Sequence, residues 1–173
     1  EIRAITNGNE KEDEKELKYK TEYKSICFNF LNTNENCFIT PNEKVPEYFN
    51  YNGSDDPKKI KTITANAYKS ITYQNIYPNI DLVFLFVTNE KGLKYYFEVK
   101  PGGDISLIQY SITGSDDPPT LNQNGDLEIP TAIGNFVDKA PDANYSNSKK
   151  PLDIKYNLKN IIVSFNYENY DHT

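Results

Sequence analysis

The chain of 173 residues has few of the side chains on which most catalytic and metal sites depend. It contains one His (His172), one Arg (Arg3) and two Cys (Cys27 and Cys37), and it has no Trp and no Met. Zinc fingers, iron–sulfur clusters, haem ligation and His-based catalysis therefore lack their usual residues. The sequence predicts no catalytic residue, no cofactor and no metal centre of these kinds.

Two further classes of partner are disfavoured by charge and hydropathy. The chain has 19 basic against 25 acidic residues, so it lacks the basic field that nucleic-acid binding requires. The longest apolar run, residues 82–87, has only six residues, which is too short for a transmembrane helix. Because no signal peptide opens the chain and residue 1 is Glu, we expect a mature form or part of a longer protein.

The residues that are abundant favour β-structure. Tyr (14) and Phe (9) can build a core although Leu is scarce, and Asn is frequent, which suits turns better than helices. Period-two alternation recurs, whereas helical periodicity is weak. We expect an all-β fold, an antiparallel β-sandwich or sandwich-like meander, with at most one or two short helical turns, at 55–60 and 103–108. Residues 1–16 are expected to form a polar lead-in, and residues 17–173 a single all-β domain.

The pattern predicts two hairpins with particular clarity. The apolar run 80–87 is expected to be a central strand buried on both faces, and it returns through a turn into 93–100. Asn124-Gly125, flanked by apolar positions, predicts a second hairpin with a type I′ turn. Other strands are expected at 17–24, 26–31, 37–40 (ended by Pro41), 67–73, 105–113, 133–137, 152–158 and 161–170. The predicted core consists of Ile80, Leu82, Phe84, Phe97, Val99 and Ile108.

One acid stands out because of its apolar surroundings. Asp81 lies between Ile80 and Leu82, and a buried carboxylate is costly unless it is hydrogen-bonded. We expect Asp81 to accept backbone or Tyr hydrogen bonds that lock a turn. Pro101-Gly102 is expected to end the strand before it as a structural turn.

Two Gly-Ser-Asp-Asp-Pro segments raise the question of calcium. Asp55, Asp56, Asp116 and Asp117 are candidate ligands, but Asp is ordinary in turns and adjacent Asp side chains point apart in a strand. The turn interpretation is favoured for both segments. Residues 122–126 (NQNGD) lack the first Asp and the distal Glu of a calcium loop, so the hairpin interpretation is favoured there too.

The two cysteines are ten positions apart, on strands expected to flank a turn at 32–36. Symmetric pairing about that turn would set Cys37 opposite Phe30, which argues against a disulfide with Cys27. An extracellular location would permit one, and the question stays open.

Four segments carry a resemblance to a known family. They are residues 73–84 (YQNIYPNIDLVF), 92–104 (GLKYYFEVKPGGD), 105–116 (ISLIQYSITGSD) and 122–129 (NQNGDLEI). Together they resemble a bacterial domain that lies N-terminal to SBBP β-propeller-type repeats and to gliding-motility-associated or PKD-like modules. Asn79 stands where that pattern usually has Gly, and Asn tolerates the same left-handed conformation.

The resemblance implies a secreted or cell-surface location, in bacteria that glide or use type 9 secretion, and no enzymatic activity. The first functional hypothesis is therefore a structural, protein-interaction module whose partners are other surface or envelope proteins. The alternative is a carbohydrate-binding adhesin module that uses exposed tyrosines. A third is a glycoside hydrolase that uses Asp81 and Glu98. The tyrosines in question are Tyr48, Tyr51, Tyr68, Tyr73, Tyr77, Tyr95 and Tyr96.

Overall fold

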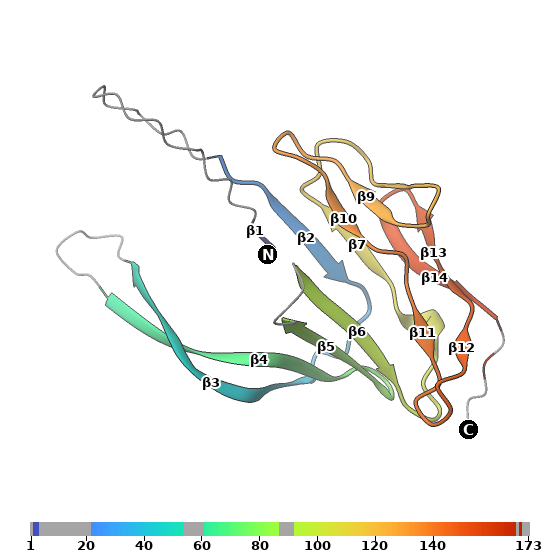
Figure 1. Ribbon diagram of the computed structural model, residues 1–173, viewed down its shortest axis with the longest axis horizontal. Helices are drawn as coiled ribbons and strands as arrows, with labels where there is room; N and C mark the ends of the chain where they lie inside the picture. The colour runs from blue at the N-terminus through green and yellow to red at the C-terminus, as the bar shows by residue number, and fades with distance from the viewer. Residues whose placement is uncertain (1, 4–21, 54–60, 87–91, 169, 171–173) are drawn as a thin grey trace. The chain divides into compact units, whose positions relative to one another are not determined.

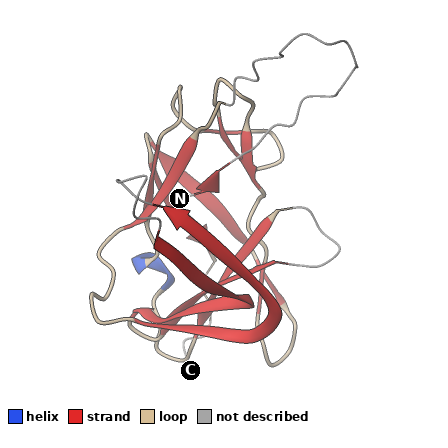
Figure 2. Cartoon of the chain, turned by 90° about the vertical axis from the view of Figure 1, so that its left-hand side faces the viewer, coloured by secondary structure: helices blue, strands red, loops and turns tan. Residues whose placement is uncertain are grey.

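The computed structural model describes residues 2–3, 22–53, 61–86, 92–168 and 170. Strands dominate this part of the chain, and its one helical element is a short 3₁₀ turn, η1 (Ile105–Leu107), as Figure 2 shows. All strand pairs are antiparallel, so the predicted all-β, sandwich-like fold class is confirmed. No helix in the described residues is long and apolar enough to cross a membrane.

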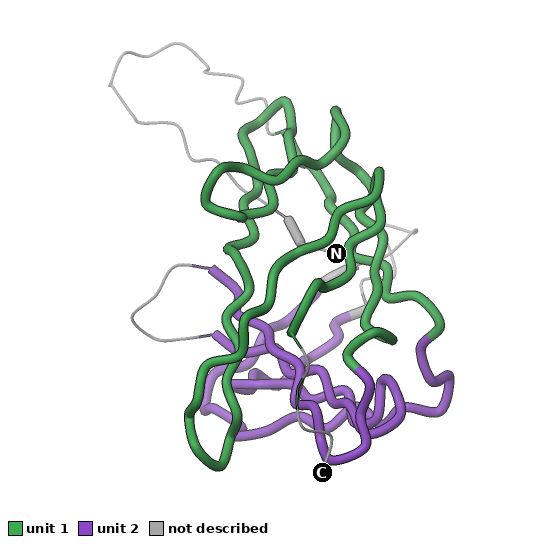
Figure 3. The backbone as a smooth tube through the Cα atoms, turned by 90° about the vertical axis from the view of Figure 1, so that its right-hand side faces the viewer, with its two compact units in different colours: residues 1–32, 105–171 green, residues 33–104, 172–173 purple. Residues whose placement is uncertain are grey.

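The chain divides into two compact units, coloured in Figure 3. Unit 1 comprises residues 1–32 and 105–171, and unit 2 comprises residues 33–104 and 172–173. Whether residues 17–173 unfold as a single domain, as the sequence analysis expects, stays a prediction.

The described residues of unit 1 form three sheets. The five-stranded sheet has the order β1 (Ile2–Arg3), β2 (Ser25–Phe30), β7 (Tyr110–Thr113), β14 (Ile162–Tyr167) and β13 (Ile154–Lys159). The three-stranded sheet has the order β10 (Phe136–Asp138), β9 (Leu127–Ile129) and β8 (Thr120–Leu121), and β11 (Ala143–Asn144) pairs with β12 (Pro151–Leu152).

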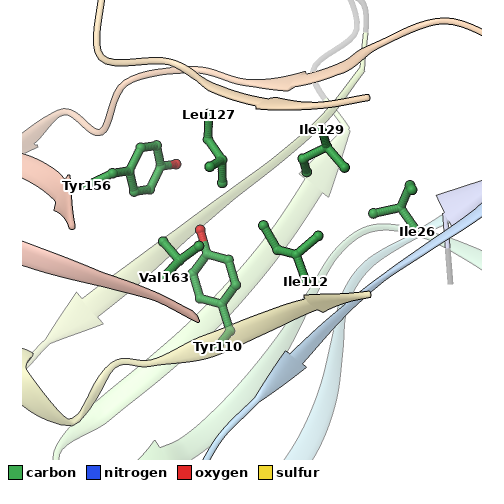
Figure 4. Packing of buried hydrophobic residues seen from close by; sticks show 7 residues of the cluster. All are labelled: Ile26, Tyr110, Ile112, Leu127, Ile129, Tyr156 and Val163. Carbon is green, nitrogen blue, oxygen red and sulfur yellow. The ribbon is translucent and has the colours of Figure 1, made fainter. Parts of the chain in front are cut away.

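The core of unit 1 lies between two of these sheets. Leu127 and Ile129 of β9 point toward side chains of the five-stranded sheet, as Figure 4 shows. Alternate residues of each strand reach this layer, which is the packing of a β-sandwich. The side chains from the five-stranded sheet are Ile26, Tyr110, Ile112, Tyr156 and Val163.

Unit 2 is a four-stranded meander in which two strands are much longer than the others (Figure 1). Its strands are β3 (Phe38–Gly53), β4 (Lys61–Tyr77), β5 (Ile80–Phe86) and β6 (Leu93–Val99), in that order across the sheet. Only the second half of β4 pairs with β5. Residues 48–53 and 61–66 therefore pair only with each other, and we call this two-stranded segment the arm.

The first two strands of unit 2 are longer than the sequence analysis predicts. The strand predicted at 37–40 does not end at Pro41, because β3 continues through both Pro41 and Pro46. As an edge strand, β3 tolerates residues that cannot donate to a ladder, and a bulge between Lys44 and Tyr48 contains Pro46. The next strand is also longer than the predicted 67–73.

Both predicted hairpins form, but one turn differs in type. The strands β5 and β6 pair from Ile80–Val99 to Phe86–Leu93. Between β8 and β9, Gly125 has a φ of 81° whereas Asn124 has no positive φ, so the predicted type I′ turn is wrong. The Gly125 N–H donates to the Asn122 carbonyl (3.0 Å), and the loop is a three-residue connection with a glycine bulge. The Asn122 side chain favours this loop because its Oδ1 accepts the N–H of Asn124 (2.9 Å).

The predicted core is only partly correct. Ile80, Leu82 and Ile108 are buried, whereas Phe84, Phe97 and Val99 are half-buried. The expectation that the apolar run 80–87 is buried throughout is wrong, since Phe86 is 69% exposed. Continuous apolar runs indicate cover on both faces, but the described residues of unit 2 form a single sheet layer.

The region around the two cysteines also differs from expectation. The strands on either side of 32–36 do not pair, because β2 lies between β1 and β7 while β3 pairs with β4. Cys27 and Cys37 are both free thiols. Of the strand predicted at 17–24, residues 17–21 lie outside the described residues and 22–24 are not in a strand. The helical turn expected at 55–60 also lies outside the described residues, whereas the one expected at 103–108 is η1.

A leucine pair in one ladder tests the core of unit 1. Leu127 is fully buried and its cross-strand partner Leu121 is exposed. Leu127→Ala should lower the free energy of unfolding by about 2–5 kcal/mol, because it leaves a cavity between the sheets. Leu121→Ala should cost less than about 1 kcal/mol. Urea unfolding followed by circular dichroism measures both, and equal losses would contradict this core.

Candidate interaction surface

The register of unit 2 sorts its side chains onto two different faces. Residues directly opposite each other share a face, and neighbours along a strand alternate. One face is almost entirely apolar, and we call it the apolar face. Its apolar members are Ile39, Pro41, Phe49, Tyr51, Ile63, Ala65, Ala67, Ile71, Tyr73, Ile80, Leu82, Phe84, Phe86, Leu93, Tyr95, Phe97 and Val99.

The opposite face of the same sheet is mostly polar. It carries cross-strand hydrogen bonds between side chains, such as Thr64 Oγ1 to Asn50 Oδ1 (2.8 Å) and Asn42 Nδ2 to Thr72 Oγ1 (3.0 Å). The sheet is therefore amphipathic along the arm, whereas near the β4–β5 turn Asp81 and Val83 of this opposite face are buried as well.

Aromatic rings cross the apolar face from strand to strand. Tyr73 of β4 contacts Phe84 of β5 with ring centroids 5.9 Å apart, and Phe84 contacts Tyr95 of β6 at 6.0 Å. Tyr95 in turn lies 6.2 Å from Phe97 in an edge-to-face arrangement. Such pairs contribute beyond the area that they bury, so they stiffen this part of the sheet.

A large part of the apolar face is exposed. Six of its side chains are between 39% and 69% exposed, and we call them the exposed apolar patch: Ile39, Phe49, Tyr51, Ile63, Ile71 and Phe86. Three of the six, Phe49, Tyr51 and Ile63, lie on the arm. Exposed apolar side chains that gather on one face of a sheet mark interaction sites in folded proteins.

Two charged side chains on the apolar face, Lys69 and Glu43, form an ion pair. Lys69 Nζ donates to Glu43 Oε2 at 2.7 Å, and both side chains are largely exposed. This contact raises the pKa of Lys69 above its usual value, through the hydrogen bond and the charge of Glu43. The patch therefore offers apolar contact, and no net charge, to whatever covers it.

The sequence-predicted acid Asp81 lies at the other end of the sheet and has a structural role. It is 6% exposed, and its Oδ1 accepts the N–H of Asn75 (2.8 Å) while its Oδ2 accepts Lys100 Nζ (2.7 Å). Asn75 has a φ of 52° and lies in the bulge between Tyr73 and Tyr77. Burial alone would raise the pKa of Asp81, but the hydrogen bonds from Asn75 and Lys100 and the charge of Lys100 outweigh it and lower the pKa.

Two tight turns meet beside Asp81. Asn79, with a φ of 57°, follows Pro78 in the connection from β4 to β5, and its carbonyl accepts the Lys100 N–H (2.9 Å). Pro101-Gly102 ends β6, and Gly102 has a φ of 80°. A side chain at Gly103 would come within 2.9 Å of the Asn79 carbonyl oxygen, so only glycine fits there.

The contacts of Asp81, one of the two carboxylates proposed as a catalytic pair, suit a structural role. Asp81 and Glu98 are directly opposite on β5 and β6 and so share a face. Both oxygens of Asp81 are already hydrogen-bonded, and its pKa is lowered. A lowered pKa does not suit a general acid, and the engagement of both carboxylate oxygens favours a structural role for Asp81.

Of the four candidate calcium ligands, Asp116 already has hydrogen-bond partners. Asp116 is bonded to Lys24 Nζ, and it accepts the N–H of Ala132 (2.6 Å). These two contacts lower its pKa, with Lys24 the larger cause. Asp117 is exposed, and Asp55 and Asp56 lie outside the described residues. Within the described ranges no group of three or more His, Cys, Asp or Glu side chains could hold a metal ion.

A buried acid that the sequence analysis did not single out anchors the β8–β9 loop. Asp126 accepts the N–H of Ala140 (3.0 Å) and Lys139 Nζ (3.0 Å), and its own N–H donates to Asn122 Oδ1 (3.0 Å). The hydrogen bonds from Ala140 and Lys139 lower its pKa despite burial. Asp126 directly follows Asn124-Gly125, where a loop must be fixed to a neighbouring segment. This position is the sequence signal from which its role could have been predicted.

The tyrosines expected to form one platform are divided between the two faces. Tyr51, Tyr73 and Tyr95 belong to the apolar face, whereas Tyr48, Tyr68 and Tyr96 belong to the polar face. Tyr77 is buried. They do not form the coplanar row that the carbohydrate-binding hypothesis requires.

The fold and the surface define an all-β protein that presents an amphipathic sheet with an exposed aromatic patch. The chain belongs to the family described as domain of unknown function DUF7948, whose model matches residues 3–173. Comparison with curated proteins gives no match, and comparison with solved structures gives none.

The contacts of Asp81 predict a pH-dependent loss of stability. Asp81→Asn keeps an acceptor for Asn75 but loses the charge that binds Lys100. It should lower the unfolding free energy at pH 7 by about 1 kcal/mol, a small value because Lys100 is 41% exposed and screened by solvent. Since the folded-state pKa of Asp81 lies below 3.8, its contribution is present above that pH and is lost as the pH falls through the folded pKa.

Urea unfolding at pH 7 and at low pH measures this effect. The difference between wild type and Asp81→Asn should shrink as the pH falls below about 4. Glu98→Gln, at the exposed cross-strand position, is the matched control and should change stability little at either pH. An undiminished difference at low pH would contradict the assigned role of the ion pair.

Proposed function

We propose that this chain is a non-catalytic protein-interaction module of a secreted or cell-surface bacterial protein. The observation that carries the proposal is the exposed apolar patch on an otherwise amphipathic sheet. Aromatic side chains are enriched at protein interfaces, where they dominate the binding energy. Phe49, Tyr51 and Phe86 supply such side chains on one face.

The structure of the arm gives this proposal a second argument. A two-stranded ribbon is marginally stable in water unless another layer covers its apolar side. The arm pairs Phe49 with Ala65 and Tyr51 with Ile63, and all but Ala65 are exposed. A partner that covered these residues would bury apolar surface and stabilise the ribbon in the same step.

The location and the kind of partner rest on the sequence. The segments 73–84 and 92–104 resemble a domain that precedes SBBP repeats and gliding-motility-associated or PKD-like modules. This supports a place in large surface assemblies, including those of gliding motility or type 9 secretion, with other surface or envelope proteins as partners. The tyrosines are separated onto two faces of the sheet, so carbohydrate binding through a tyrosine platform is the weaker hypothesis.

Site-specific photo-cross-linking tests the proposal. A photoreactive phenylalanine at position 49, on the apolar face, should cross-link to protein in the bacterium that makes this chain. The same residue at position 48 is the matched control, because Tyr48 (61% exposed) and Phe49 (57%) are neighbours on opposite faces. Cross-linking at 49 should exceed that at 48 by about tenfold, because interface positions are shielded and close to the partner.

Two results would contradict this function. Equal or absent cross-linking at both positions would show that the apolar face is not an interface. Binding of defined oligosaccharides that is lost in Tyr51→Ala would instead select the carbohydrate-binding reading.

A further inference from the structure

We propose that the exposed apolar patch packs against the same patch of a second copy of this chain. The two unit 2 sheets would lie face to face in a twofold-symmetric dimer. The inference rests on the proposed function, and it identifies the partner as a second copy of the same chain.

The exposed area matches what such a dimer needs. Three aromatic side chains that are more than half exposed and three partly exposed isoleucines present roughly 500 Å² of apolar surface. Two copies that cover each other's patch would therefore bury about 1,000 Å², which is the lower bound for a specific interface. Half-buried neighbours such as Tyr95 would add to this area.

The charge distribution suits a self-complementary contact. In a twofold interface each side chain faces a copy of the same surface, so any unpaired charge near the axis meets its like. The apolar face reduces this conflict, because Lys69 and Glu43 form an ion pair with each other and the six residues of the exposed apolar patch are uncharged.

The geometry favours contact through the face and disfavours contact through the edge. The edge strand β3 contains Pro41, Pro46 and a bulge between Lys44 and Tyr48, and Glu43 has a φ of 52°. Such features block the pairing of another strand along an edge. Stacked sheets, by contrast, interdigitate aromatic and β-branched side chains across about 10 Å, and Phe49, Tyr51 and Ile63 are of this type.

Sedimentation velocity of the full chain over a range of concentrations tests the inference. The wild type should approach twice the 19.9 kDa of one chain at concentrations of roughly 10–100 µM. Phe49→Ser should weaken dimerisation by at least about 30-fold, because each dimer loses the aromatic contact twice. Tyr48→Ser, the matched control on the polar face, should change the dissociation constant less than about threefold.

Circular dichroism establishes that each variant is folded, and Tyr51→Ser serves as a second variant should Phe49→Ser not fold. A monomer at all concentrations would overturn the inference, as would a dimer weakened equally by Tyr48→Ser and Phe49→Ser. If the chain is monomeric but position 49 still cross-links to a different protein, the second copy is wrong while the proposed function stands. If the chain is monomeric and neither position cross-links, both are wrong.

Discussion

The structure of unit 2 depends on how its one strongly apolar sheet face is covered. A sheet that is hydrophobic on one face must bury that face against another layer. Near the Pro78-Asn79 turn this condition is met, since Ile80 and Leu82 are buried. Along the arm it is not met, because Phe49, Tyr51 and Ile63 are exposed. The same hydrophobic effect that stabilises the buried end therefore favours association at the exposed end.

The apolar face exists only because the register of the strands is fixed. A one-residue slip would move every side chain of a strand to the other face. Asp81 holds the bulge at Asn75, and Lys100 ties the end of β6 to the same carboxylate. Asp81, one of the carboxylates considered for catalysis, therefore helps to fix the register that sorts the side chains onto two faces. A lowered pKa keeps it ionised in this role.

Local patterns in the sequence predicted the fold class and the two hairpins, because alternation and turn residues report directly on neighbouring strands. They did not predict the length of β3, since Pro41 ends a central strand but not an edge strand, and edge position is a property of the whole sheet. Nor did they separate Tyr48 from Tyr51 by face. No strand was predicted at 48–53, and the ladder that pairs Phe49 with Ala65 and Tyr51 with Ile63 places the two tyrosines on opposite faces. The arm, which carries half of the exposed apolar patch, is formed by this pairing between β3 and β4.

Hydrogen exchange at the backbone amides of residues 48–53 and 61–66 tests the central claim most directly. It compares the arm at low and high protein concentration, with residues 80–82, at the buried end of the same sheet, as the internal reference. The account predicts fast exchange in the arm at low concentration, because a two-stranded ribbon opens readily, and marked protection at high concentration, where its apolar face is covered. Protection of the arm that is strong at every concentration, or that never appears, would contradict it.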